Sequence, residues 1–164
     1  MAEEWKHTVL LVIDMQKDLI LPYSPAAVKG GEAIVPNVIN AVEVARNRDI
    51  PIIWVVREHD SLGRDVESFR RHFYASDKTK LLVKGSPGAE LVEGSWNLQD
   101  SRVQTPNCIR QTVFDAVSLD YDEVTVIVDA TAAATAEIHN ANVVDMKNIG
   151  VATPTLEEWC HTNN

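Results

Sequence analysis

The sequence predicts one α/β domain built on a parallel β-sheet. Three apolar, β-branched runs support this fold class, at residues 8–13, 51–56 and 124–128, and helical patterns lie between them. Apolar runs without alternation are typical of strands that are buried on both faces by helices. The first and third runs each end at an acid, Asp14 and Asp129, as expected at a polar sheet edge. The strand–helix–strand order predicts a right-handed βαβ unit.

The remaining elements follow in order along the chain. The first helix is expected to open at Pro36, because proline suits a first helical turn. Further helices are expected over residues 109–119 and about 135–148, before a weak last strand at 150–152. Between Arg57 and Asn107 the chain is mostly polar, and no good strand is predicted there. Such a long irregular stretch is unusual inside a compact domain.

Composition narrows the function classes. The 164 residues are 45% hydrophobic, which suits a single domain over residues 1–164. A net charge of −9 argues against a nucleic-acid or anionic-membrane partner. Two cysteines, Cys108 and Cys160, do not make a disulfide framework or a zinc site. Without a signal peptide or an apolar run long enough to span a membrane, we expect a cytoplasmic protein.

Two residues stand where chemistry is expected. Asp14 follows a buried strand, at the edge where open α/β sheets bind ligands, although an isolated aspartate there more often caps a turn. Cys108 opens a predicted helix, whose N-terminal amides favour the thiolate and can hold an oxyanion. The alternative for a lone cysteine is a buried, inert residue. Cys160 fits that alternative, because it lies in a polar tail.

Six ordered segments resemble the isochorismatase-like cysteine hydrolases, a superfamily that includes nicotinamidases. They are residues 11–18, 57–60, 85–91, 103–112, 129–133 and 155–159. The resemblance implies a three-layer, doubly wound parallel sheet and cleavage of a small amide through a cysteine thioester. It assigns Asp14 as the acid/base, Cys108 as the nucleophile, and the backbone N–H groups of Gln104 and Cys108 as the oxyanion hole. It also implies a cis peptide bond between Val103 and Gln104.

The same resemblance sets expectations for ligands and partners. The zinc-binding Asp/His set of nicotinamidases does not appear after Val56, where Arg57-Glu58-His59 stands. The chain therefore resembles the metal-free members, and we expect neither a metal nor another cofactor. The expected partners are a small-molecule substrate and, as a homo-oligomer, further copies of the chain.

The chain departs from this family between residues 95 and 102. The family places a strand with a catalytic lysine, a helix and the nucleophile strand after the Gly-Ala-Glu-Leu landmark, with the nucleophile strand beside the first strand. Here residues 95–102 run directly into Val103, and no lysine lies between Lys84 and Lys147. We therefore predict an internal deletion of about 30 residues, the size of a strand–helix–strand unit. The sheet would be left as two halves with unpaired edges, and Asp14 would lack a cationic partner.

Two functions follow, with a weaker third. The first is a hydrolase that acts through Cys108. The second is a catalytically impaired or inactive form, acting by binding or by joining oligomers of a complete form. The third, a flavodoxin-like ligand-binding domain, lacks a glycine-rich phosphate loop to support it.

Overall fold

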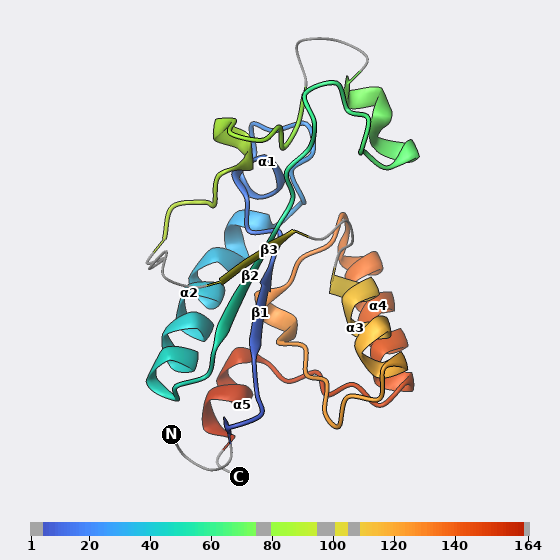
Figure 1. Ribbon diagram of the computed structural model, residues 1–164. Helices are drawn as coiled ribbons and strands as arrows, with labels where there is room; N and C mark the ends of the chain where they lie inside the picture. Colours follow the sequence, from blue (N-terminus) through green and yellow to red (C-terminus); the bar gives the residue numbers. More distant parts are fainter. Residues whose placement is uncertain (1–4, 75–79, 95–100, 105–108, 163–164) are drawn as a thin grey trace.

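A parallel sheet of three short strands forms the centre of the fold (Figure 1). The computed structural model describes residues 5–74, 80–94, 101–104 and 109–162. Strand β2 (Ile52–Val56) lies between β1 (Leu10–Ile13) and β3 (Ser101–Gln104), and all pairs are parallel. The α/β class expected from the sequence is confirmed.

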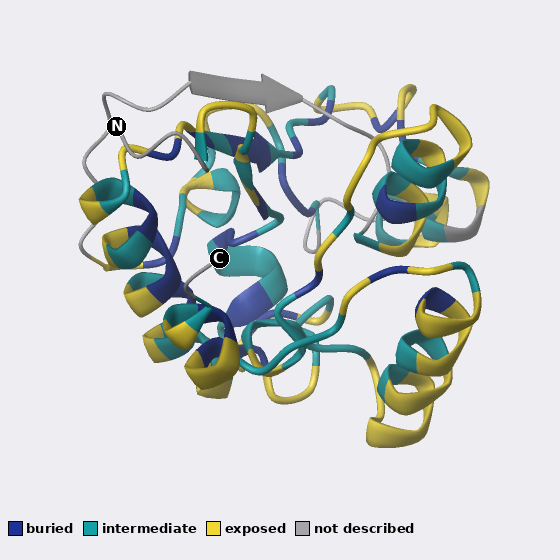
Figure 2. Cartoon of the chain, turned by 90° about the horizontal axis from the view of Figure 1, so that it is seen from below, coloured by how far each residue is buried: buried dark blue, intermediate teal, exposed yellow. Residues whose placement is uncertain are grey.

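The main core lies between the sheet and helix α2 (Gly31–Asn47), which connects β1 to β2. Trp54 of β2 is only 2% exposed in this core. Figure 2 shows the buried residues of α2 along the side that faces the sheet. These buried residues are Gly31, Val38, Ala41, Val42 and Ala45. Their spacing is that of one helix face, so apolar burial explains why the segment is helical.

Helix α2 begins before Pro36, so the expected start of this helix is wrong. Gly30 precedes it with φ 80°, in the left-handed region that glycine adopts readily. Gly31 packs so closely on Ile20 that an added Cβ would lie 3.2 Å from the Ile20 Cα. Pro36 removes one helical hydrogen bond, and burial of the apolar face stabilises the helix despite that loss.

Strand β3 corrects two expectations. It forms within a polar stretch where no strand was predicted, and it pairs with β2 rather than lying beside β1. Ile53 pairs with Ser101 and Val56 with Gln104. Backbone N–H and C=O groups at an open strand edge need partners whatever the side chains are, and this requirement overrides weak strand propensity.

The run at 124–128 is not part of the sheet, contrary to the prediction. Thr125 forms one isolated parallel bridge with Ala152, which also accounts for the weak strand expected at 150–152. The chain then turns into the short 3₁₀ helix η4 (Val128–Ala130). Among the described strands β1 pairs only with β2, and Val9 and Leu11 are 43% and 40% exposed. The run therefore lacks the neighbouring strand that would join it to β1.

Two predicted helices form a second, smaller unit. Helix α3 (Ile109–Ser118) and helix α4 (Ala136–Asn148) pack on each other, to the right of the sheet in Figure 1. Both predictions are confirmed. The Thr135 hydroxyl caps α4 by accepting a hydrogen bond from the Ile138 N–H at 3.2 Å. A separate core holds the unit together, and its buried residues are Val113, Val126, Met146 and Val151.

The C-terminal helix α5 (Leu156–His161) closes the main core. It starts with a capping box between Thr155 and Glu158. Cys160, expected in a polar tail, is half-buried in α5 and packs against the core. The guanidinium of Arg48 lies 4.8 Å from the Trp5 ring centre and 5.1 Å from that of Trp159. It also donates to the Trp159 and Cys160 carbonyl oxygens, at 3.3 and 2.7 Å.

Replacing Arg48 by alanine is expected to lower the free energy of unfolding by about 1–2 kcal/mol. The change removes two hydrogen bonds to carbonyl groups at the end of α5 and two cation–π contacts. Urea unfolding measures the loss. Arg64→Ala is the matched control, because Arg64 is exposed and pairs only weakly with Asp60 in water. Equal effects of the two substitutions would contradict a stabilising role for Arg48.

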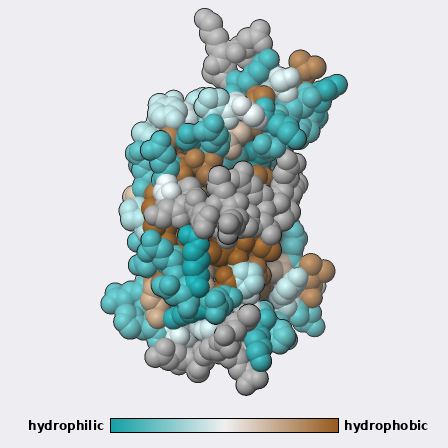
Figure 3. Space-filling view, turned by 60° about the vertical axis from the view of Figure 1, so that its left-hand side comes forward, coloured by the Kyte–Doolittle hydropathy of each residue, from teal (hydrophilic) through white to brown (hydrophobic). Residues whose placement is uncertain are grey.

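The outer surface is mixed in polarity. Figure 3 shows apolar atoms around the middle of one face, with polar side chains above and below. None of the described helices combines the length and the apolar character that crossing a membrane requires.

Candidate active site

Asp14 lies directly after β1, at the carboxyl edge of the sheet. Its φ is 61°, in the left-handed region that costs energy for a residue with a Cβ. Its backbone N–H donates to the Val55 carbonyl at 2.9 Å, which continues the ladder between β1 and β2. Aspartate adopts this region more readily than most residues, and Asp49 and Asp120 share it, so the conformation fits the turn that follows β1.

Arg57 is the cationic partner of Asp14. Its Nε lies 3.0 Å from Asp14 Oδ2 and 3.3 Å from Oδ1. The Arg57 side chain is 1% exposed and that of Asp14 16%. The expectation that Asp14 lacks a positive partner is therefore wrong. That expectation was based on lysines alone, whereas the turn after β2 brings an arginine to the same carboxyl edge of the sheet.

Gln16 fixes the backbone of Arg57, and the sequence interpretation missed it. Its side chain is fully buried. Its Nε2 donates to the Arg57 and Ala89 carbonyl oxygens, and its Oε1 accepts from the Arg57 N–H, all at 2.7 Å. The available signal was a glutamine next to a run of core residues, since a buried amide requires several partners.

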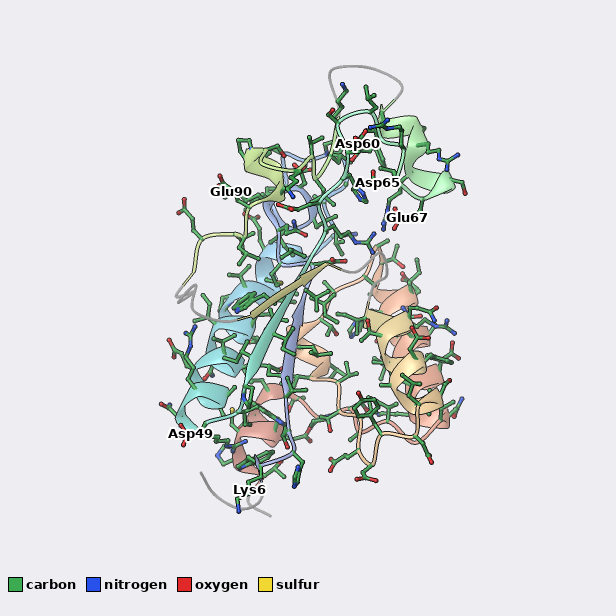
Figure 4. All side chains as sticks on the ribbon, in the orientation of Figure 1. Lys6, Asp49, Asp60, Asp65, Glu67 and Glu90 are labelled. Carbon is green, nitrogen blue, oxygen red and sulfur yellow. The ribbon has the colours of Figure 1, made fainter. Side chains whose placement is uncertain are left out.

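Glu67 and Arg70 extend the charged network. Arg57 Nη1 lies 2.5 Å from Glu67 Oε1, and Arg70 Nη1 lies 3.0 Å from the same oxygen. Figure 4 labels Glu67 and shows it just beyond the carboxyl ends of the strands. Glu67 Oε2 is buried and has no hydrogen-bond partner among the described residues. Two carboxylates and two guanidinium groups therefore meet at this edge.

The environment changes the acidity of both carboxylates. Burial raises the pKa of Asp14, and the charge and hydrogen bond of Arg57 oppose this rise only in part. Burial also opposes ionisation of Glu67, but its backbone hydrogen bond and Arg57 together hold the pKa of Glu67 below its usual value. A carboxyl group with a raised pKa suits proton transfer near neutral pH.

An apolar hollow adjoins the network and shares Arg70 with it. It is formed by the segments that follow β2 and by the loop after β1. Its lining includes Leu19, His59, Val66, Phe73 and Leu82. Its cavity volume is about 20 Å³, which is room for a water molecule but not for the body of a small-molecule substrate. Within the described ranges, no group of three or more His, Cys, Asp and Glu side chains is arranged to hold a metal ion.

The other predicted site residues are placed only in part. Gln104 ends β3 opposite Val56, so it shares the sheet edge of Asp14 with β2 between them. Cys108 lies outside the described residues, and α3 begins at the next residue, as the helix prediction required. No cis peptide bond occurs in the described backbone, so the one implied at Val103–Gln104 is not found. Such a bond costs about 3 kcal/mol and needs surroundings that hold it.

Asp129, the second acid after an apolar run, has a structural role. Its Oδ1 accepts a hydrogen bond from the Leu156 N–H at 2.7 Å, and so caps the first turn of α5. The two strand-end acids of the sequence therefore differ, and only Asp14 belongs to the network.

Comparisons with known proteins all find similarity to the same family. The Isochorismatase domain model matches residues 8–102 and 103–158. A protein of Arabidopsis thaliana named "probable inactive nicotinamidase" is 56% identical over 191 aligned residues, covering 97% of each chain. An isochorismatase family protein of Desulfovibrio vulgaris has a TM-score of 0.84 and 32% identity, over 93% of this chain and 95% of its own.

A more distant structure supports the fold alone. The isochorismatase-like hydrolase of Alkaliphilus metalliredigens has a TM-score of 0.77 at 22% identity, covering 93% of this chain and 96% of its own. The ordered sequence segments, the acid at the end of β1 and these similarities lead to the same result. The chain belongs to the isochorismatase family of hydrolases.

Proposed function

We propose that the chain hydrolyses a small amide through a thioester on Cys108, with Asp14 as the acid/base. The observation that carries this proposal is the state of Asp14. It is half-buried at the end of β1, its pKa is raised, and Arg57 orients its carboxylate. A raised pKa and an oriented carboxylate are features that a proton-transfer residue uses.

The proposed reaction needs one proton carrier. Asp14 takes the proton from the Cys108 thiol as sulfur bonds to the amide carbon, and the carbonyl oxygen gains negative charge. The backbone N–H groups of Gln104 and Cys108 stabilise that oxyanion. When the C–N bond breaks, Asp14 returns the proton to the leaving nitrogen. Water then attacks the thioester while Asp14 accepts one of its protons, and Asp14 gives that proton to sulfur as the C–S bond breaks, which releases the acid and restores the free thiol.

The name of the Arabidopsis relative makes nicotinamide the first amide to assay. The reduced thiol that the reaction requires supports a cytoplasmic location. A homo-oligomer stays a prediction, which light scattering of the purified chain measures.

Assay of the purified chain against a panel of small amides tests the proposal. We expect turnover that Cys108→Ala and Asp14→Asn each abolish, because either change removes a reacting group. Cys160→Ser is the matched cysteine control and should retain the wild-type rate, since Cys160 lies in α5. A known nicotinamidase serves as the positive control. Turnover that persists in Cys108→Ala would exclude Cys108 from the mechanism.

A second candidate is the catalytically impaired form, and specific observations favour it. The family match is divided between Arg102 and Val103, and the Arabidopsis alignment spans 191 residues against 164 in this chain. Both observations support the proposed internal deletion. In addition, β3 lies beside β2, which separates Gln104 from Asp14 by about 10 Å at the usual strand spacing. Cooperative thermal unfolding together with no turnover above the Cys108→Ala background would select this candidate.

A further inference from the structure

Arg57 is more deeply buried than either carboxylate that it contacts. Its side chain is 1% exposed, against 16% for Asp14 and 20% for Glu67. A guanidinium stays protonated at every pH at which the protein is folded, so its charge must be matched inside the fold. The two carboxylates match it, one through Nε and one through Nη1. Burying a charged guanidinium costs free energy unless its carboxylate partners are held in good hydrogen-bonding geometry.

The fold fixes that geometry from two directions. Gln16 holds both the N–H and the carbonyl of Arg57 at 2.7 Å, so the backbone cannot shift. Glu67 holds the far end of the guanidinium, and Arg70 contacts the same Glu67 oxygen. The Nε–H is then left facing the Asp14 carboxylate. Four separate contacts therefore determine where one N–H points.

We propose that Arg57 is the positioning cation of this site. It orients the Asp14 carboxylate and favours its ionised form, in place of the lysine that the chain lacks. Gln16 and Glu67 in turn hold Arg57. The effect of Arg57 on catalysis rests on the proposed function, whereas its effect on the pKa of Asp14 does not. Arginine suits the task because its fork contacts two carboxylates at once, which a lysine ammonium does less well.

The charges around Asp14 explain the need for this cation. Arg57 and Arg70 favour the ionised carboxylate, whereas burial and the negative Glu67 oppose it. Without Arg57, the pKa of Asp14 would rise further, and a protonated acid cannot accept the thiol proton. One N–H shared by the two oxygens leaves lone pairs free on Asp14. Proton transfer thus stays with Asp14, and Arg57 acts only through it.

Titration of Asp14 tests the proposal without any need for turnover. The carboxyl carbon of Asp14 is followed by NMR and assigned by its loss in Asp14→Asn. In Arg57→Gln the midpoint should move to higher pH, and Arg57→Lys should restore part of the difference. In Glu67→Gln it should move to lower pH, because a negative neighbour is lost while an acceptor for Nη1 is kept. Arg64→Gln, a change at an exposed arginine, should leave the midpoint unchanged.

The outcomes separate the two proposals. An unchanged Asp14 midpoint in Arg57→Gln would overturn the role of Arg57, because a space-filling side chain does not move it. If Arg57→Gln does not fold, Arg57→Lys decides, because an ammonium keeps the charge but not the two-carboxylate fork, and its Asp14 midpoint should lie above that of the wild type. The pH profile of Cys108 alkylation, measured in a Cys160→Ser background, reports on coupling between Asp14 and the thiol. Shifted Asp14 midpoints with no change in alkylation and no turnover would reject the hydrolase and keep the positioning cation.

Discussion

Gln16→Ala is expected to lower the free energy of unfolding by about 3–5 kcal/mol, the largest effect that we predict. The buried amide makes three hydrogen bonds at 2.7 Å, two to Arg57 and one to Ala89. Alanine would leave these three backbone groups without partners, at about 1–3 kcal/mol for each buried group. Penetration of water into the cavity would recover part of the loss. Urea unfolding followed by circular dichroism measures it.

Two further glutamine variants make this test specific. Gln111→Ala is the matched control, because Gln111 is exposed on α3 and pairs only with Asp115, a contact of about 0.5 kcal/mol or less. Gln16→Glu keeps an acceptor for the Arg57 N–H but loses both donated bonds, so it should also destabilise strongly. A loss below about 1 kcal/mol in Gln16→Ala would show that Arg57 does not depend on this amide.

Gly88→Ala is expected to cost about 2–3 kcal/mol. Gly88 lies in the 3₁₀ helix η3 (Pro87–Ala89), against helix α1 (Lys17–Ile20). A Cβ at this position would lie 2.1 Å from Asp18 Oδ2, which is far inside contact distance. Asp18 would have to move and lose its hydrogen bond to the Leu82 N–H at 2.7 Å. Overpacking and a lost bond to a charged acceptor together give the stated cost.

A double-mutant cycle identifies the cause of this loss. Asp18→Ala removes the carboxylate that Gly88→Ala would displace, so the second substitution should then cost little. Thermal unfolding of the four proteins gives the coupling energy between the two positions. If Gly88→Ala is equally harmful with and without Asp18, backbone strain in η3 and not the carboxylate is responsible.

Local patterns predicted the elements that rest on apolar periodicity. Elements that bury one face or both have a periodic apolar pattern in the sequence, and that pattern predicts them. These elements are β1, β2, helix α2 and the helices at residues 109–118 and 136–148. Elements that rest on backbone pairing or capping were missed. Strand β3 has one apolar residue, Val103, among its four, and α5 is only six residues long. The run at 124–128 has strand character but lacks a neighbour in the sheet.

The candidate site shows the same division. The sequence by itself determined the family, the position of Asp14 at the end of an apolar strand and the absence of lysine between Lys84 and Lys147. Only the tertiary structure decided which cation meets Asp14, because Arg57 is 43 residues away in the chain and reaches Asp14 through the pairing of β1 with β2. Strand pairing brings distant charges together, and no local pattern records which partner arrives.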